Sequence, residues 1–226
     1  MNNELWLIWK QNTTRRRYKV GTLSYEKQKY NFTYQSEELE DASKAGFDCF
    51  PGFPDKEQVY TSEELFTNIK TRLPNPQRPD YLHILNKYSL TSQSSALDIL
   101  AKTKGRLITD TYEFVKAFNK NEIEFDIAGI SHCKDYDKIK ENLLVNDKIE
   151  LETEKENKYD TYAIKITITK EKKKYHLGYV PRYYSKELYT ILKEKKAYSA
   201  LIKNLSLDNE MYDKDMIISI RLIIES

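Results

Sequence analysis

The sequence contains few of the residues that cross-link small proteins or bind structural metals. Among 226 residues there are two cysteines, Cys49 and Cys133, in different halves of the chain, and three histidines. Without a CxxC pair these residues do not form a typical structural zinc site, and two distant cysteines favour a reduced chain. We therefore expect no metal, no cofactor and a cytoplasmic location.

Long apolar runs and a surplus of one charge are missing too. No apolar stretch reaches the roughly 18 residues of a membrane span, and the start Met-Asn-Asn-Glu lacks the basic and apolar blocks of a signal peptide. The 37 basic and 35 acidic residues are mixed along the chain, which gives a net charge of +2. Such a chain has no global field to attract a polyanion, so any nucleic-acid site must be a local patch.

Recognisable catalytic motifs are also missing. The sequence has no G-x-S-x-G, P-loop, G-x-G-x-x-G, H-E-x-x-H or kinase H-R-D signature. Carboxylates are plentiful, but no motif places a pair of them. We expect a protein that is not an enzyme, and a nuclease or hydrolase component is the least favoured reading.

Apolar residues make up 39% of the chain, which is enough for two small domains to bury a core each. The hydrophobic period is mixed in the first half and changes to that of strands near residue 121. We therefore predict an α+β fold with two domains, an α+β module over residues 1–118 and a β-domain over residues 121–226.

Alternation of apolar and polar residues in the first half predicts a β-meander from residue 5 to residue 34. Two prolines and two glycines interrupt regular structure over residues 46–55. Helical spacing then predicts three short helices, over residues 65–73, 81–88 and 94–103.

The second half reads as six strands and one helix. Many short strands with one crossover helix favour a small closed or half-closed barrel. The helix is expected over residues 185–195, and the strands over residues 123–130, 148–153, 162–169, 175–180, 199–205 and 216–223.

Two clusters stand out in this half. A polar turn, Glu-Asn-Lys-Tyr-Asp-Thr-Tyr-Ala-Ile over residues 156–164, leads into a buried strand, and Leu-Gly-Tyr-Val-Pro-Arg over residues 177–182 ends another strand before a helix. Together with the opening strand 125–130 and the closing strand 217–223, this order resembles the HIRAN domain over about 100 residues. The resemblance implies a small HIRAN-type β-barrel with one or two helices.

In better-known members of that family, attached to DNA-remodelling helicases, the domain captures the 3′ end of single-stranded DNA. The resemblance places Asn157, Tyr159 and Asp160 at the sugar and terminal hydroxyl, Tyr179 after the strand glycine, and Arg182 at a phosphate. Aromatic faces stack on any base, and a guanidinium matches phosphate oxygens.

This chain departs from the family after the glycine of the first strand. Ser131 and His132 stand where those members have a basic and an aromatic residue, which removes part of the expected stacking and phosphate contact. From residue 121 onward there are 19 basic and 20 acidic residues, a net charge of −1, which argues against tight binding of duplex DNA without regard to sequence.

The first half resembles the N-terminal subdomain of HipA-type kinases. The order is Val-Gly-Thr-Leu at 20–23, an aromatic strand at 30–34, Phe66-Thr-Asn68 before Leu-Pro, and Ile99-Leu100 before Gly-Arg. The kinase core is missing, so the resemblance implies a protein-docking module, with a separately encoded HipA-like kinase as a partner. We expect an exposed apolar docking surface made of Trp9, Phe47, Phe50 and Phe53.

The same residues have simpler interpretations. Asn157 and Asp160 are common in hairpin turns, and Tyr179 could be a core residue. Arg15–Arg17 and Lys172–Lys174 are typical of solvated loops and hairpin tips. Two functions stay open: an accessory protein that binds single-stranded DNA or DNA 3′ ends, and an antitoxin-like regulator that binds only protein.

Overall fold

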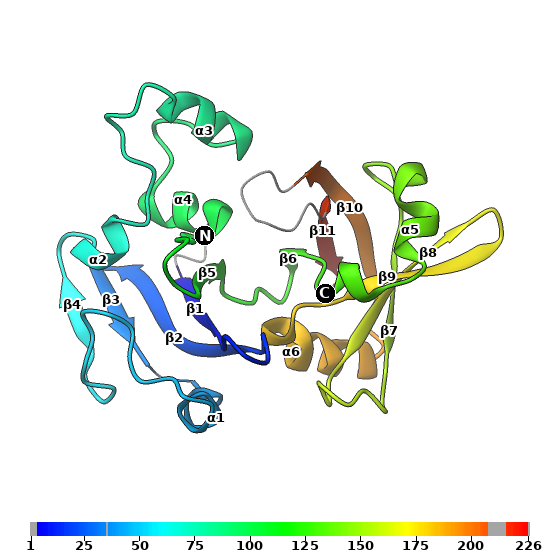
Figure 1. The fold of residues 1–226 in the computed structure, drawn as a ribbon, viewed down its shortest axis with the longest axis horizontal. Helices are drawn as coiled ribbons and strands as arrows, with labels where there is room; N and C mark the ends of the chain where they lie inside the picture. The colour runs from blue at the N-terminus through cyan, green and yellow to red at the C-terminus, as the bar shows by residue number, and fades with distance from the viewer. Residues whose placement is uncertain (1–3, 35, 208–215, 226) are drawn as a thin grey trace. The chain divides into compact units, whose positions relative to one another are not determined.

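A computed structural model describes residues 4–34, 36–207 and 216–225. The start Met-Asn-Asn, part of the segment in which no signal peptide is expected, lies outside these residues. Contacts divide the chain into a first unit, Met1–Ala117, and a second unit, Phe118–Ser226. The elements of each unit are labelled in Figure 1.

The first unit is built on a five-stranded antiparallel sheet with the order β4-β3-β2-β1-β5. The predicted meander is confirmed, because the first three strands pair consecutively. A fifth strand, which the sequence did not suggest, pairs with β1. The strands are β1 Glu4–Lys10, β2 Arg17–Glu26, β3 Lys29–Thr33, β4 Tyr60–Ser62 and β5 Tyr112–Lys116.

Four short helices accompany this sheet: α1 Leu39–Lys44, α2 Thr67–Lys70, α3 Tyr81–Lys87 and α4 Ala96–Thr103. The last two match the predicted helices, and Ser95 caps α4 by accepting a hydrogen bond from the Asp98 amide. The helix predicted over residues 65–73 is reduced to α2. Thr61 and Ser62 precede the predicted helix and, as residues with a preference for helix N-caps, favour its start, but they lie in β4, paired with β3.

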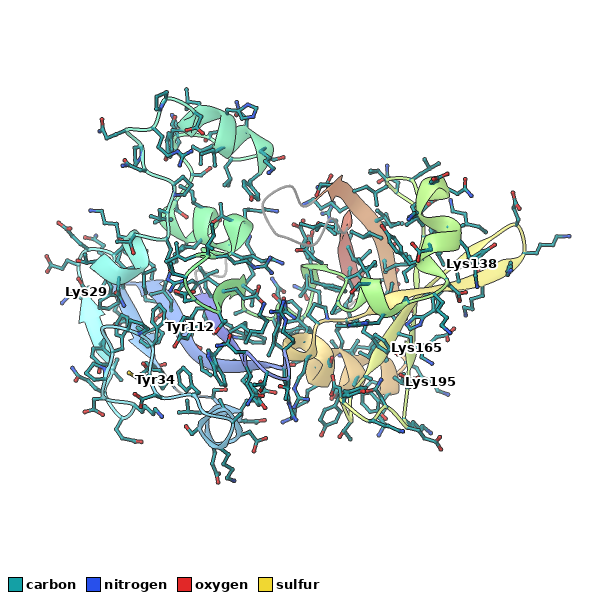
Figure 2. The ribbon with its side chains drawn as sticks, in the orientation of Figure 1. Lys29, Tyr34, Tyr112, Lys138, Lys165 and Lys195 are labelled. Atoms are coloured by element: carbon teal, nitrogen blue, oxygen red, sulfur yellow. The ribbon has the colours of Figure 1, made fainter. Side chains whose placement is uncertain are left out.

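Three of the four predicted docking aromatics are core residues, and the fourth, Trp9, is partly buried against the same core. Phe47, Phe50 and Phe53 are 4%, 0% and 1% exposed, and Trp9 stacks on Tyr18 with ring centroids 5.7 Å apart. The Tyr34 hydroxyl explains how this loop folds inward. It donates to the carbonyl of Phe53 at 2.6 Å and accepts from the amide of Phe50 at 2.7 Å. Tyr34 is labelled among the side chains in Figure 2. The expectation that these four side chains form an exposed docking surface is therefore wrong.

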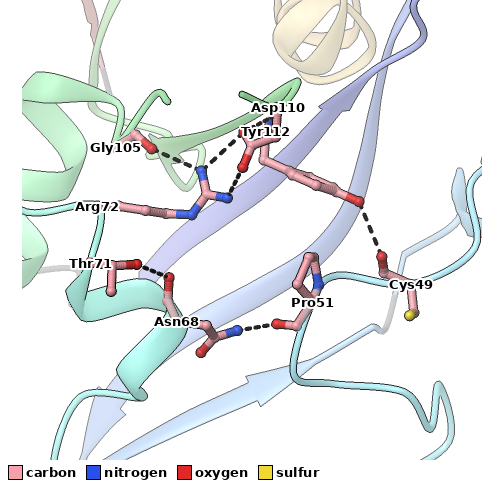
Figure 3. A network of polar contacts seen from close by, with 8 residues as sticks. All are labelled: Cys49, Pro51, Asn68, Thr71, Arg72, Gly105, Asp110 and Tyr112. Carbon is pink, nitrogen blue, oxygen red and sulfur yellow. Dashed lines mark hydrogen bonds and ion pairs between the residues drawn. The ribbon is translucent and has the colours of Figure 1, made fainter. Parts of the chain in front are cut away.

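A second polar network, drawn in Figure 3, reaches the same loop at Cys49 and Pro51. Arg72 forms a buried ion pair with Asp110 and donates to the carbonyl of Gly105 at 3.0 Å. Its guanidinium also lies over the Phe50 ring, 5.1 Å from the centroid. Tyr112 donates to the carbonyl of Cys49 at 3.1 Å. The bond from Tyr112 satisfies a backbone carbonyl of the loop that would otherwise need water.

The second unit contains two three-stranded antiparallel sheets with the orders β10-β11-β6 and β7-β8-β9. All six strands lie where the sequence predicts strands. Their bounds are β6 Glu122–Asp126, β7 Glu150–Thr153, β8 Ile164–Lys170, β9 Lys173–Tyr179, β10 Tyr198–Leu207 and β11 Met216–Ile224.

The two sheets meet at isolated bridges rather than along continuous ladders. Ala128 pairs with Tyr179 at one junction, and Lys148 pairs with Leu201 at the other. Since the strand ladders are interrupted at both places, the predicted closed or half-closed barrel is not confirmed.

Two α-helices belong to this unit, α5 Tyr136–Ile139 and α6 Arg182–Lys193, with 3₁₀ turns at Ile130–His132 and Lys140–Asn142. The predicted helix 185–195 is confirmed as α6, although it begins three residues earlier. Among the described residues, no helix is both long enough and apolar enough to span a bilayer.

Candidate nucleic-acid interface

Three segments of the second unit meet around Tyr179. The amides of Ala128 and Tyr179 each donate to the other's carbonyl at 2.8 Å, which joins the end of β6 to the end of β9. The Val180 amide donates to the carbonyl of Ile164 at 3.0 Å, which adds the start of β8. The polar turn before β8 therefore lies beside both strand ends.

Gly178 makes this convergence possible. It has a φ of +145°, and a Cβ at this position would lie 2.5 Å from Cγ2 of Ile127 and 2.6 Å from the carbonyl oxygen of Ala128. No side chain larger than hydrogen fits there without displacing the neighbouring backbone. The glycine of the Leu-Gly-Tyr-Val-Pro motif thus has a structural role, which is to let two chain segments approach closely.

Asn157 organises the turn before β8. Its Oδ1 accepts the amides of Tyr159 at 2.9 Å and Asp160 at 3.1 Å, and its Nδ2 donates to Glu154 at 2.7 Å. Asp160 continues the pattern, since its Oδ1 accepts the amide of Tyr162 at 3.0 Å. Asn and Asp therefore act here as turn-forming residues, the simpler of their two predicted roles. This geometry fixes how the intervening tyrosine is presented.

Glu154 connects the turn to Tyr179. Its Oε2 accepts the Tyr179 hydroxyl at 3.1 Å, and its Oε1 lies 2.5 Å from the Lys165 ammonium. Burial alone would raise the pKa of Glu154, but hydrogen bonds from Asn157, Lys165 and Tyr179 hold it below its usual range. Burial and the bond to the ionised carboxylate raise the pKa of Tyr179 to about 12, so its hydroxyl stays a donor at neutral pH.

Tyr159 projects from this framework. Its side chain is 85% exposed, although its backbone is held by Asn157 and by Arg182, whose Nη1 donates to the Tyr159 carbonyl at 3.0 Å. Arg182 is the first residue of α6. The structure thus brings together five of the predicted site residues: Asn157, Tyr159, Asp160, Tyr179 and Arg182.

Ser131 and His132 reach the same region through the backbone. Both are exposed and lie in the 3₁₀ turn that follows Gly129, a residue in the left-handed conformation with a φ of +71°. A Cβ on Gly129 would lie 3.8 Å from the Tyr179 ring. Ser131 and His132 therefore follow, by two and three residues, a glycine that lies beside the Tyr179 ring.

Two residues of the cluster were missed by the sequence interpretation. Glu154 directly follows β7 and Lys165 lies in β8, so the two residues flank the polar turn. Their ion pair can be recognised only once the register of the two strands is known. A charged pair at such spacing is common in hairpins and gives no functional signal by itself.

One residue of each basic run forms ion pairs within the chain, Arg17 in the first run and Lys174 in the second. Arg17 and Arg106 both pair with Glu113, and these cations, despite its burial, hold the pKa of that carboxyl well below its usual range. Lys174 pairs with Glu150 at 2.8 Å and also with Glu152, next to the β8–β9 hairpin tip. Within the part of the chain that the structure describes, no group of three or more His, Cys, Asp or Glu side chains could hold a metal ion.

Comparison with known proteins gives one family match. The model of the HIRAN domain family matches residues 120–214. Two solved structures are similar to the chain, each over 46% of its length and with a TM-score of 0.35. A structural-genomics target from Lactobacillus plantarum is 21% identical, with 92% of that chain covered, and the HIRAN domain of human HLTF is 12% identical, with 74% covered. No curated protein matches the chain.

The family match leaves residues 1–119 unassigned, so the resemblance of the first half to HipA-type kinases stays a prediction. In the second half, the HIRAN family match covers the ends of β6 and β9, the polar turn and α6, which are the segments that carry the candidate interface. Residues 120–214 thus match the HIRAN domain, a family of nucleic-acid-binding domains.

Proposed function

We propose that the chain is a non-catalytic accessory protein whose HIRAN domain binds single-stranded DNA at its 3′ end. The observation that carries this proposal is the presentation of Tyr159, an aromatic side chain that is 85% exposed on a backbone held by defined hydrogen bonds. A rigidly presented aromatic stacks on a base with little loss of conformational entropy. The terminal base of the strand occupies its face.

The charges around Tyr159 suit a strand end better than a duplex. Arg182 supplies a guanidinium for a phosphate, while Asp160 beside it would repel a continuous phosphate backbone. A hydroxyl can donate to a carboxylate, so the 3′-hydroxyl is the DNA group that Asp160 tolerates best. The net charge of −1 from residue 121 onward also disfavours duplex binding without sequence preference.

The alternative, a regulator that binds only protein, has lost its expected site. Of the aromatics that were to form the docking surface, Phe47, Phe50 and Phe53 are buried in the core of the first unit, and the partly buried Trp9 packs against that core. A HipA-like partner therefore has no supporting observation among the described residues.

Fluorescence anisotropy with the full chain tests the proposal. Two labelled 12-nucleotide strands of one sequence are compared, one with a 3′-hydroxyl and one with a 3′-phosphate. We expect the 3′-phosphate to weaken binding by a factor of ten or more, because its charge meets Asp160 where a hydroxyl would donate. Equal affinity for both strands would show that the 3′ end is not recognised.

A further inference from the structure

One face of α6 carries a regular series of cationic and aromatic side chains. Arg182, Lys186, Tyr189 and Lys193 are spaced by four, three and four residues, which places them in one line along a helix. The opposite face packs into the unit through Tyr184, Leu188 and Ile191, all buried. The series, here called the α6 stripe, is therefore the outward face of an anchored helix.

The middle of the α6 stripe has an aromatic partner in the polar turn. The rings of Tyr162 and Tyr189 lie 5.5 Å apart at 69°, and the Lys193 ammonium lies 5.0 Å from the centroid of the Tyr189 ring. Tyr162 is 39% exposed. An edge-to-face pair of partly exposed tyrosines under a lysine resembles the mixed surface that single-stranded nucleic acids contact.

The α6 stripe begins where the proposed end site lies. Its first residue, Arg182, donates to the carbonyl of Tyr159, and Tyr162 follows Tyr159 by three residues in the same turn. From residue 182 to residue 193 the helix advances roughly 16 Å. Aromatic and cationic groups thus continue from the end site along the helix for the length of several nucleotides.

We propose that the α6 stripe binds the nucleotides that precede the 3′ end of a single strand. Tyr162 and Tyr189 offer ring surfaces to the bases, and Lys186 and Lys193 contact the phosphates. The inference rests on the proposed function, because the strand end at Tyr159 sets where the path starts. The acidic side chains nearby do not break the line: Glu187 lies on the flank of the helix, and Glu194 pairs with Lys196 at 3.3 Å.

Strand length separates this inference from the end site. Anisotropy is measured with the full chain and oligothymidines of 3 and 12 nucleotides, both with free 3′-hydroxyls. The wild type should bind the 12-nucleotide strand several-fold more tightly. Tyr189→Ala should weaken binding of that strand by about fivefold or more and leave the 3-nucleotide strand unchanged. Lys193→Gln should lower the slope of log affinity against log salt for the longer strand by about 0.7.

Tyr189→Phe, which keeps the ring, is the matched control and should bind both strands like the wild type. Thermal unfolding of each variant shows whether α6 stays folded. If Tyr189→Ala and Lys193→Gln bind the 12-nucleotide strand like the wild type while Tyr159→Ala does not, the α6 stripe is rejected and the end site stands. If the wild type binds neither strand, the proposed function and this inference both fail.

Discussion

At the scale of a single residue, Tyr159 allows the contribution of a side chain to DNA binding to be tested separately from its contribution to stability. Its ring is 85% exposed, so it contributes little buried surface, whereas its amide and carbonyl are both hydrogen-bonded. Removing the ring should leave the turn intact, since the hydrogen bonds belong to the backbone. A side chain with this combination is well placed for a contact outside the chain.

Tyr159→Ala should therefore weaken binding of single-stranded DNA by roughly 1–3 kcal/mol, the usual value of one stacked base. The free energy of unfolding should change by less than about 0.5 kcal/mol. Anisotropy and urea titration measure the two quantities, with Tyr159→Phe as the control that keeps the ring. A variant that loses stability as much as affinity would show a structural residue instead.

Glu154 gives the site a dependence on pH. Its folded pKa is held below the ordinary value of 4.5, so its contribution to stability is full above that value and is lost as pH falls through the folded pKa. The hydrogen bonds at risk are those from Asn157 and from the hydroxyl of Tyr179.

Glu154→Gln should cost about 1 kcal/mol of unfolding free energy at pH 7, because the charge-assisted bonds are weakened. The free energy of unfolding of the variant should then fall less than that of the wild type between about pH 6 and pH 3, because glutamine has no carboxylate to be protonated as the pH falls. Urea titration at a series of pH values measures this difference. Parallel pH profiles for the two proteins would contradict the role given to Glu154.

The junction of β6 and β9 is the element on which the interface depends. Gly178→Ala would place a methyl group 2.5 Å from Cγ2 of Ile127, and we expect the bridge between Ala128 and Tyr179 to open. The expected cost is about 1–3 kcal/mol. Hydrogen exchange of the Ala128 and Tyr179 amides should show the loss of protection.

Gly129→Ala is the matched control for this junction. Gly129 is also left-handed, but the nearest atom to a Cβ there is 3.8 Å away, so the cost should be about 1 kcal/mol and mainly conformational. Wild-type protection of the Ala128 and Tyr179 amides in Gly178→Ala would show that the bridge stays closed and does not depend on the glycine.

At the same scale, the strands were more predictable than the way they assemble. Alternation along β8 and β9 and the helical spacing of α6 come from one local period, and the sequence shows it directly. The strand β5 was missed because Tyr112–Lys116 lies between polar segments and owes its conformation to pairing with β1. Sheet closure depends on bridges between distant residues, such as Lys148 and Leu201, which no local pattern encodes.

The burial of Phe50 and Phe53 was mispredicted for a related reason. A segment with two prolines and two glycines reads as an exposed loop. Its inward fold depends on Tyr34 and on Arg72, which lie 16 and 22 residues from Phe50 in the sequence. Residues 157–160 and 179–182 lie in two short motifs that the sequence shows directly, whereas the pairing of Glu154 with Lys165 became visible only with the strand register.

For the whole molecule, the balance of charge makes the proposed function a local one. With a net charge of +2 over the chain, long-range attraction contributes little, and affinity must come from the side chains around Tyr159. The proposed function therefore predicts where the DNA binds: the 3′ end of a single strand contacts the polar turn and the start of α6.

Photocrosslinking measures that place directly. A 12-nucleotide strand with 4-thiothymidine as its 3′-terminal nucleotide is irradiated with the full chain, and the crosslinked peptides are identified by mass spectrometry. We predict crosslinks within residues 157–162 and 179–182, reduced strongly when the strand carries a 3′-phosphate. Crosslinks confined to residues 4–117, or equal labelling of the same peptides by a strand with the photoreactive base at its 5′ end, would contradict the account.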